Sequence, residues 1–315
     1  MSPLELGKIG PLGEAYRDEG QPLPVGCVII LDFDRPDLTQ ACVRSVLTTW
    51  LGSVVVVENG STELRSELPD CVEYLHLGAN LGFSGGMNSG IRLAHNRGSS
   101  FVLLLNNDAR VGPGAIDAMF DCLNLNPQLA IVTPARGPRY RSLSVGGPSA
   151  DVSGEVSSVG KSETKLVSVA RVTGCCMAIR LSSLYQTGLL DEDFFFGRED
   201  DELSCRMLAH GYGLAELSGI AVDHAGGSSA PLAEEEAAKF VSYHYSRGEI
   251  LLARKTSRPL LLGATRAVLE LLKISLKGYL VGGYSPTSVV VAGIRGMKAG
   301  AKARLNPPPF LSQPP

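Results

Sequence analysis

The sequence Phe101-Val-Leu-Leu-Leu105 is followed directly by Asn106-Asn107-Asp108, a pattern typical of a buried β-strand that ends in polar residues. Two earlier stretches repeat this pattern, Val25–Leu31 followed by Asp32 and Ser53–Val57 followed by Glu58. Continuous apolar strands are characteristic of parallel sheets that are covered on both faces. The sequence therefore predicts an α/β fold with a Rossmann-like, mostly parallel sheet flanked by helices.

Helical stretches alternate with these strands, as the connections of a parallel sheet require. Further strands are expected over Val72–Leu77 and Val169–Arg180. Helices are expected over four stretches of suitable period, Leu38–Trp50, Gly85–Arg97, Gly114–Asn124 and Glu199–His210. The Gly-, Ser- and Val-rich stretch Ser142–Lys165 is expected to form a hairpin or a mobile loop.

Composition divides the chain into four regions. Residues 1–24, with many Gly, Pro and charged residues and no clear period, are predicted to be an N-terminal arm. Residues 25–232 contain the alternating strands and helices of the α/β domain. Residues 233–305 are predicted to form a C-terminal helical extension, and the Pro-rich residues 306–315 a disordered tail.

The charge of the chain is small but unevenly distributed. Its 315 residues are 44% hydrophobic and carry a net charge of -3, which supports a large core and does not indicate a nucleic-acid-binding protein. From Arg247 to the end, 11 Lys and Arg stand against two acids, Glu249 and Glu270, a local charge of +9 that leaves -12 for the first 246 residues. This asymmetry indicates that any anionic partner would bind to the basic C-terminal part of the chain.

The basic residues of the C-terminal region recur at helical spacing. Arg266, Glu270, Lys273 and Lys277 fall on one face of a predicted helix, and apolar residues lie elsewhere on it. Such a helix either contacts a membrane surface or a lipid-linked acceptor, or packs on its own sheet with a solvated charged face. Both alternatives stay open at this point.

The seven cysteines are scattered through apolar surroundings and contain no C-x-x-C pair, which argues against zinc and thioredoxin-type sites. Reduced, buried thiols are typical of a cytoplasmic protein. The N-terminal residues lack the apolar stretch of a secretory signal, and no run of about 20 residues is free of charge. We therefore expect a cytoplasmic protein, at the inner face of the membrane if its basic helices contact lipid.

Polar residues at the ends of the predicted strands are the first candidates for a site, because ligands of open α/β sheets bind beyond the carboxyl ends of the strands. They are Asp32, Glu58 and Asn106–Asp108. Each could serve turn formation alone. Three polar strand ends in one half of a sheet favour a ligand site.

A glycine-rich stretch runs from Asn80 to Gly90 and precedes a predicted helix. Glycines there would let the backbone approach a phosphate, and a helix N-terminus favours an anion. A dinucleotide-dependent oxidoreductase carries its glycines directly after the first strand, as a nucleotidyltransferase carries a basic glycine-rich loop. This chain has Asp32–Pro36 at that position, which disfavours both classes.

An acidic cluster lies in the second half, with seven acids between Leu190 and Leu203. The helix dipole accounts for the acids of Glu199–Glu202 at a helix N-terminus. It does not account for the three aromatic residues Phe194–Phe196 just before them. Further on, His224 precedes a Gly-rich loop, where it is either structural or a ligand.

Taken together in chain order, these motifs resemble the family two glycosyltransferases of the GT-A fold, and most of all their bacterial rhamnosyl- and galactofuranosyl-transferase branch. The similarity covers about residues 25–300. It rests on collinear motifs: the strand ending in Asp32-Phe-Asp-Arg-Pro, Glu58-Asn-Gly-Ser-Thr, the loop Asn80–Gly90, Asn106-Asn-Asp108, Gly188-Leu-Leu-Asp-Glu-Asp-Phe-Phe, Glu199-Asp200, His224-x-Gly-Gly-Ser and Tyr243-x-Tyr-x-Arg247.

The resemblance implies a role for each matching position. Glu58 would contact a pyrimidine base, and Asn106 the ribose. Asp108, the last position of the family's D-x-D motif, would hold a metal ion that His224 completes. The nucleotide side would be lined by further positions: Asp32, Asn80, Gly82, Gly86, Asn88 and Asn107.

The resemblance also implies the catalytic groups. Asp200 would be the base that activates the acceptor hydroxyl, and Glu199 would orient the acceptor. Asp201 and Glu202 lie about 100° and 200° further round the helix, so these acids cannot all face one substrate. Phe194–Phe196 would form an apolar wall that limits access of water.

We thus expect an inverting, metal-dependent glycosyltransferase that moves a sugar from a UDP- or dTDP-sugar to an acceptor hydroxyl, with Mg²⁺ or Mn²⁺ as cofactor. The acceptor would be a glycan, a lipid-linked glycan or a natural product. The alternative is a non-catalytic nucleotide- or carbohydrate-binding module of the same fold. Loss of Asp108 or Asp200 would favour that alternative, and both are present.

Overall fold

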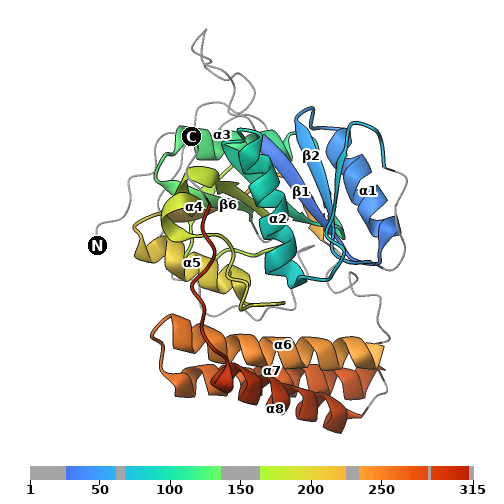
Figure 1. Ribbon diagram of the computed structural model, residues 1–315, viewed down its shortest axis with the longest axis vertical. Helices are drawn as coiled ribbons and strands as arrows, with labels where there is room; N and C mark the ends of the chain where they lie inside the picture. The colour runs from blue at the N-terminus through green and yellow to red at the C-terminus, as the bar shows by residue number, and fades with distance from the viewer. Residues whose placement is uncertain (1–25, 62–67, 136–163, 225–233, 283–284, 312–315) are drawn as a thin grey trace.

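The computed structural model describes residues 26–61, 68–135, 164–224, 234–282 and 285–311. The predicted N-terminal arm and nearly all of the predicted loop Ser142–Lys165 lie outside these residues. Between them, the described segments contain a helix-covered sheet and, in Figure 1, a separate layer of C-terminal helices below it.

The central sheet has eight strands in the order β3-β2-β1-β4-β8-β6-β9-β7. The strands β3, β2, β1 and β4 run parallel, as do β6 and β9, whereas β8 is antiparallel to both of its neighbours and β7 to β9. Their bounds are β1 Gly26–Asp32, β2 Ser53–Glu58, β3 Glu73–His76, β4 Phe101–Asn106, β6 Leu129–Pro134, β7 Leu166–Ser168, β8 Cys176–Arg180 and β9 Gly213–Leu217. The mostly parallel sheet predicted from the sequence is confirmed.

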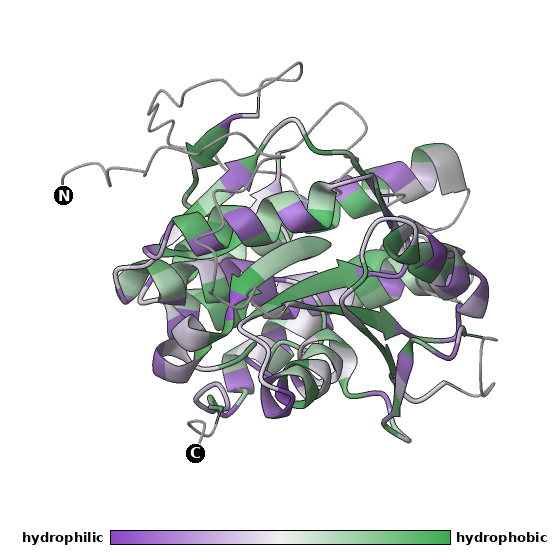
Figure 2. Ribbon diagram, turned by 90° about the horizontal axis from the view of Figure 1, so that it is seen from above, coloured by the Kyte–Doolittle hydropathy of each residue, from purple (hydrophilic) through white to green (hydrophobic). Residues whose placement is uncertain are grey.

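Helices cover both faces of the sheet. Because successive side chains of a strand point to opposite sides, each strand contributes apolar residues to both faces. Val28 and Ile30 of β1 pack in one apolar cluster with α1 and α3, while Ile29 packs in a second cluster with α2, α4 and α5. The central strands accordingly appear as continuous green bands in Figure 2. The helix bounds are α1 Pro36–Leu47, α2 Gly82–Asn96, α3 Ala115–Leu125, α4 Leu181–Thr187 and α5 Glu199–Ala209.

The strand predicted over Val169–Arg180 is wrong in its first half, because only β8 belongs to the sheet. The segment before β8 makes its hydrogen bonds to other elements. The N–H of Val172 donates to Oγ of Ser204, and the N–H of Gly174 donates to Oδ2 of Asp200. These contacts hold the segment against α5 instead of continuing the strand.

The C-terminal region is helical, as predicted, and consists of α6 Glu234–Lys255, α7 Leu260–Lys277, the π-helical turn η1 Gly278–Gly282 and α8 Pro286–Lys302. Ser257, with φ of 54°, and Pro259 interrupt the helix between α6 and α7. Arg198 at the start of α5 joins this layer to the sheet domain through an ion pair of 2.9 Å with Glu249 of α6.

The prediction of a disordered tail is wrong for residues 306–311. Beyond α8 the chain returns to the sheet domain and passes α4 and α5 (Figure 1). The N–H of Leu189 donates to the carbonyl of Pro309 at 2.7 Å, Asn306 donates to Asp193, and the side chain of Leu311 is buried in the cluster of α2 and α5. The segment is ordered because its carbonyl and apolar side chains satisfy groups of the domain.

Candidate functional site

The polar strand ends meet at one edge of the sheet, as expected from the sequence. Asp32 at the end of β1 pairs in register with Glu58 at the end of β2, and Leu31 pairs with Asn106 at the end of β4. Asn107 and Asp108 continue from β4 into the short strand β5 Ala109–Val111. The register therefore places these groups side by side along the carboxyl edge.

A hydrogen bond between the buried side chains of Asn107 and Asp32 connects the ends of β4 and β1. The amide of Asn107 donates to Oδ1 of Asp32 at 3.4 Å and to Oγ1 of Thr39 at 3.1 Å. Burial raises the pKa of Asp32, an effect that its hydrogen bond with Thr39 opposes. The amide of Asn107 is thus engaged inside the protein, which differs from its expected position against a nucleotide.

Glu58 is almost fully buried and organises the turn that follows β2. Its carboxylate accepts a hydrogen bond from the N–H of Ser61 and lies in contact with Nδ1 of His76 at the end of β3. The ring of His76 is 46% exposed, so this side chain extends the buried carboxylate toward solvent. His76 was not predicted as a site residue. It lies on β3, the strand next to the one that ends in Glu58, and no motif in the sequence links the two residues.

Asn59 and Asn80 hold the loop before α2. The amide of Asn59 donates to Oδ1 of Asn80 at 3.1 Å and to the carbonyl of Gly82 at 3.0 Å, and its Oδ1 accepts from Leu81. Oδ1 of Asn80 also accepts from the N–H of Gly82. Asn59 belongs to the motif Glu58-Asn-Gly-Ser-Thr, but no role was predicted for it from the sequence. In the structure it holds the loop in place.

The glycines of this loop serve close packing of the chain on itself, which differs from the predicted approach to a phosphate. A Cβ at Gly82, where φ is 72°, would lie 2.4 Å from the carbonyl oxygen of Phe195. A Cβ at Gly86 would lie 2.4 Å from Cδ1 of Leu31. Because Gly82 already begins α2, these positions are the contact of the helix with β1 and with the loop 194–196.

Asn88 also differs from its expected position facing a nucleotide. Its side chain is fully buried in α2, where the amide donates to the carbonyl of Leu190 at 2.9 Å and to Oε1 of Glu192 at 2.9 Å. Its Oδ1 accepts from the N–H of Leu190. Asn88 therefore fixes the segment that leads to the acidic cluster onto α2.

Asp108 and His224 lie together although they are distant in the sequence. The strands β5 and β10 Val222–His224 form an antiparallel pair in which His224 is opposite Ala109. Nε2 of His224 consequently lies 3.1 Å from Oδ1 of Asp108, and 3.4 Å from the amide of Asn106.

This pair fits the first ligands of a divalent cation. Neighbouring ligands of an octahedral Mg²⁺ or Mn²⁺ site lie roughly 3 Å apart, because each is about 2.1 Å from the ion. A carboxylate and an imidazole suit Mn²⁺. Among the residues that the structure describes, no group of three or more His, Cys, Asp or Glu is placed to hold a metal, so oxygens of a ligand would have to supply the other positions.

Arginines separate the acidic cluster into structural and available carboxylates. Asp201 forms ion pairs with Arg171 at 2.9 Å and with Arg198 at 3.2 Å. Glu202 pairs with Arg206 at 2.7 Å, and Arg206 also donates to carbonyls at the end of α4. These two acids hold α5 in place and are not free to act on a substrate.

Glu199 and Asp200 remain, and within the described part of the chain neither forms an ion pair with a lysine or arginine. Oδ2 of Asp200 accepts from Gly174 at 3.0 Å and Oδ1 accepts from the N–H of Asp201. Oε2 of Glu199 is buried without a hydrogen-bond partner among the described residues. Burial raises the pKa of both carboxyls, and repulsion of neighbouring acids raises each further. Such a pair retains a proton near neutral pH.

The segment 174–175 connects the acidic pair to the strand ends. The N–H of Gly174 binds Asp200, and the carbonyl of the next residue, Cys175, accepts from the N–H of Asn106 at 2.9 Å. One turn of backbone thus fixes Asp200 relative to the residues that lead into Asp108. The two halves of the predicted site are brought together.

The three phenylalanines predicted to form an apolar wall are divided: Phe194 is buried against Leu251 and Leu252, whereas Phe195 and Phe196 belong to an aromatic group near the acidic pair. Phe195 stacks on His244 of α6 with a centroid distance of 5.2 Å, and Phe196 stacks on Tyr245 at 6.0 Å. Phe240 lies 4.4 Å from His244. Burial lowers the pKa of His244 to about 4, so its ring is neutral at physiological pH.

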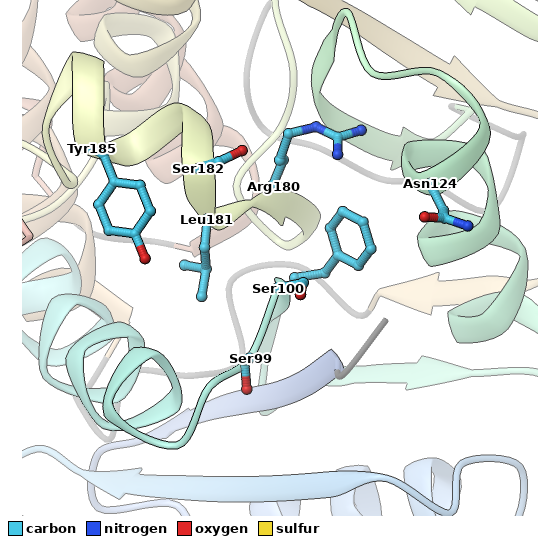
Figure 3. A pocket seen from close by; sticks show the side chains of 8 residues that line it. Ser99, Ser100, Asn124, Arg180, Leu181, Ser182 and Tyr185 are labelled. Atoms are coloured by element: carbon cyan, nitrogen blue, oxygen red, sulfur yellow. The ribbon is translucent and has the colours of Figure 1, made fainter. Parts of the chain in front are cut away.

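A hollow of about 340 Å³ lies at another place (Figure 3). It is lined by the residues before and at the start of β4 and by the junction of β8 with α4. The guanidinium of Arg180 is turned toward α3, where it donates to the carbonyls of Leu123 and Asn126. The fold thus uses this charge to hold α3.

Comparison with known proteins agrees with the fold and the motifs. A family model described as Glycosyl transferase family 2 matches residues 27–187. The low-salt glycan biosynthesis hexosyltransferase Agl10 of Haloferax volcanii is 30% identical over 172 residues, which cover 49% of this chain and 52% of that protein. An N-acetylglucosaminyl-diphospho-decaprenol L-rhamnosyltransferase of Mycobacterium tuberculosis is 28% identical over 186 residues, covering 49% of this chain and 60% of that protein. The chain thus spans little more than half the length of these relatives.

Two solved structures share the fold. The mannosyltransferase PcManGT from Pyrobaculum calidifontis, in complex with GDP-Man and Mn²⁺, superposes with a TM-score of 0.56 at 13% identity, covering 96% of this chain and 80% of that one. GalNAc-T7 with UDP, GalNAc and Mn²⁺ gives 0.52 at 15% identity, covering 77% and 52%. The fold is of the GT-A type. Since the family model covers just over half of the 315 residues, the chain belongs to glycosyl transferase family 2.

Proposed function

We propose that this protein is an inverting glycosyltransferase that moves a sugar from a UDP- or dTDP-sugar to an acceptor hydroxyl. The observation that carries the proposal is the Glu199–Asp200 pair, which forms no ion pair with the described residues and is held by Gly174 and Cys175 next to the strand end that bears Asn106–Asp108. Family membership supports the reaction type.

Asp200 takes the role of the base in this proposal. Its raised pKa suits proton transfer near neutral pH, because a base works best when its pKa lies close to the working pH. The carboxylate accepts the proton of the acceptor hydroxyl while that oxygen attacks the anomeric carbon. Glu199 beside it supplies a second oxygen that can orient the hydroxyl. A single base opposite the leaving group gives inversion at the anomeric carbon.

The donor would lie along the carboxyl edge of β1, β2 and β4. Glu58 and His76 are placed at the end where a base and ribose would bind, and Asn106 stands between them and Asp108. A divalent cation held by Asp108 and His224 would neutralise the charge that develops on the leaving diphosphate. Both structural relatives described above were solved with Mn²⁺, which supports this cofactor.

The acceptor in this proposal is a lipid-linked glycan. The named substrate of the mycobacterial relative, a diphospho-decaprenol, supports that class. The aromatic side chains of Phe195, Phe196 and Phe240 suit the apolar faces of a sugar ring or a prenyl chain near the base.

A nucleotide screen followed by product analysis tests the proposal. UDP or dTDP with Mn²⁺ should raise the melting temperature, because a ligand that binds only the folded state stabilises it, and NAD should not. With the stabilising nucleotide as sugar donor, proton NMR of the first product should show an anomeric configuration opposite to that of the donor. Retained configuration would contradict inversion. Stabilisation without any transfer or hydrolysis, over a panel of sugars, would favour the non-catalytic module instead.

A further inference from the structure

The outer side of α7 is apolar and exposed. Of the 18 large hydrophobic side chains exposed in the described part of the chain, 11 lie between residues 260 and 294. The most exposed include Leu261 at 78%, Leu272 and Leu276 at 59% each, and Tyr279 of η1 at 67%. Such a concentration on one element marks an interaction surface, because scattered exposed residues are ordinary whereas a contiguous patch is not.

Helix geometry shows that these side chains form one surface. Val268, Leu272 and Leu276 recur at intervals of four, on the side of α7 opposite to its buried residues Gly263 and Ala267. At 100° per residue, the exposed apolar positions of α7 from Leu261 to Leu276 cover an arc of roughly 120°. Helical spacing separates the apolar positions from the charged ones, and packing against α6 and α8 determines which side of α7 is buried.

The flank of this apolar arc is positively charged. Arg266, Lys273 and Lys277 follow the arc on one side, and α8 adds the exposed Arg295, Lys298 and Lys302. The one acid between residues 260 and 304 is Glu270. Its buried carboxylate lies 3.6 Å from Arg198 and 3.9 Å from Nζ of Lys273, so it offsets only a small part of the positive charge of this flank.

We propose that the outer face of α7, η1 and α8 docks on a membrane surface rich in anionic lipid. An apolar helix face bordered by Lys and Arg lies in the boundary between lipid headgroups and acyl chains, and each cation near an anionic leaflet adds to the attraction. Tyr279, at the end of the arc, is a residue type that favours this boundary. In Figure 1 the layer that contains α7 and α8 lies at the end of the molecule below the sheet domain, so docking through this layer would leave that domain outside the lipid.

The same features argue against other occupants. A symmetric pairing of two copies through this face would place these six cations of one copy near the same six of the other, with only Glu270 as counter-charge. In the described residues no helix is long and apolar enough to cross a bilayer, and the 18 residues of α7 include four charged ones. The geometry therefore favours a helix that lies on the lipid surface.

Vesicle co-sedimentation of the full chain tests the inference without reference to sugar transfer. Phosphatidylcholine vesicles are compared with vesicles that also contain phosphatidylglycerol, at low and high salt. The wild-type chain should bind the anionic vesicles more tightly, and salt should weaken the binding. Leu272→Glu combined with Leu276→Glu should reduce binding at least about tenfold, because two apolar side chains would have to leave the lipid as charges.

The matched control is Leu51→Glu, which replaces a fully exposed leucine at 101% on the α1–β2 loop and should leave binding unchanged. Removing Lys298 and Lys302 together should weaken binding to anionic vesicles by about fivefold per cation, whereas Arg44→Ala on α1 should not. These positions are exposed, so circular dichroism should show folded variants.

Three results would overturn the inference. The first is negligible binding of the wild-type chain to both kinds of vesicle. The second is equal, salt-independent binding to both, which would remove the role of the cations. The third is a dimer in solution that Leu272→Glu with Leu276→Glu converts to a monomer while vesicles stay unbound, since a second copy would then cover the face. Because none of these readouts involves catalysis, failure here leaves the proposed transfer reaction intact.

Discussion

Nε2 of His224 lies 3.1 Å from Oδ1 of Asp108, across the two-stranded pair β5–β10. The sequence offered only two isolated candidates for a metal site, one after the fourth strand and one before a glycine-rich loop. The antiparallel pairing of Val222–His224 with Ala109–Val111 is what makes them neighbours. A separation suited to two ligands of one cation makes the pair directly testable.

Removing either ligand should weaken nucleotide binding that depends on Mn²⁺. For Asp108→Ala and His224→Ala we expect a loss of at least about tenfold, in the range seen when groups around a metal are removed. Isothermal titration of UDP or dTDP with and without Mn²⁺ measures it. Asp223→Ala, which replaces an exposed acid next to His224, is the control and should bind as the wild type does. Unchanged binding in Asp108→Ala would mean that this carboxylate holds no metal.

The acidic pair should make stability depend on pH. Burial raises the pKa of Glu199 and Asp200 above the ordinary values of 4.5 and 3.8, so the folded state binds more protons than the unfolded state between these values and the raised ones. The contribution of this pair to the free energy of unfolding should therefore be largest below about pH 4 and decrease as the pH rises into the neutral range. Urea unfolding of the wild type and of Glu199→Gln, from about pH 5 to about pH 8, should show a shallower decrease in the variant.

The control for this pH dependence is Asp70→Asn, at an exposed acid away from the site, which should keep the wild-type slope. An equal slope in Glu199→Gln would show that Glu199 is not the group that retains the proton. Other titrating groups contribute equally to the wild type and the control, so the comparison isolates the pair.

The backbone before the acidic pair should be intolerant of a side chain. Gly197 has a φ of 79°, and a Cβ there would lie 2.2 Å from Cε1 of Tyr245. Gly197→Ala should reduce the free energy of unfolding by about 2 to 5 kcal/mol, from left-handed strain together with overpacking. Gly98 has the same φ of 79° with nothing within 4 Å, so Gly98→Ala should show the strain alone. Equal losses in urea unfolding would contradict the packing argument.

The half of the sheet that precedes residue 110 could be predicted from the sequence because its signals are local. The apolar runs that end in Asp32, Glu58 and Asn106 are long enough to define strands, and the polar residue after each marks its end. The strands β6 and β9 were not predicted. Leu129–Pro134 and Gly213–Leu217 are short runs whose pairing depends on distant parts of the chain, which periodicity cannot show.

The errors have the same origin. Proline-rich composition predicted a disordered tail, yet Pro309 supplies a carbonyl to Leu189 and Leu311 an apolar side chain, and both partners lie far away in the sequence. The glycines at 82 and 86 suggested a phosphate loop, although the atoms that require them belong to Phe195 and Leu31. Composition predicts what a residue permits, whereas tertiary contacts determine its use.

The choice of the catalytic base among Glu199–Glu202 also depends on tertiary contacts. Spacing showed that Glu199–Glu202 cannot face one substrate, and the resemblance favoured Asp200. Only the structure pairs Asp201 with Arg171 and Glu202 with Arg206. These arginines are distant or unremarkable in the sequence, so the availability of Asp200 could not be argued from it physically.

The central claim is that Asp200 is the catalytic base, and the rate of sugar transfer by Asp200→Asn tests it most directly. The variant should remain folded and bind the donor nucleotide and Mn²⁺ as the wild type does, with Asp70→Asn as a fully active control. Its turnover should decrease about 10²- to 10⁴-fold, the usual cost of removing a general base. A folded Asp200→Asn chain that binds the donor and transfers sugar within about twofold of the wild-type rate would contradict the account, because no base catalysis would then remain to assign to this residue.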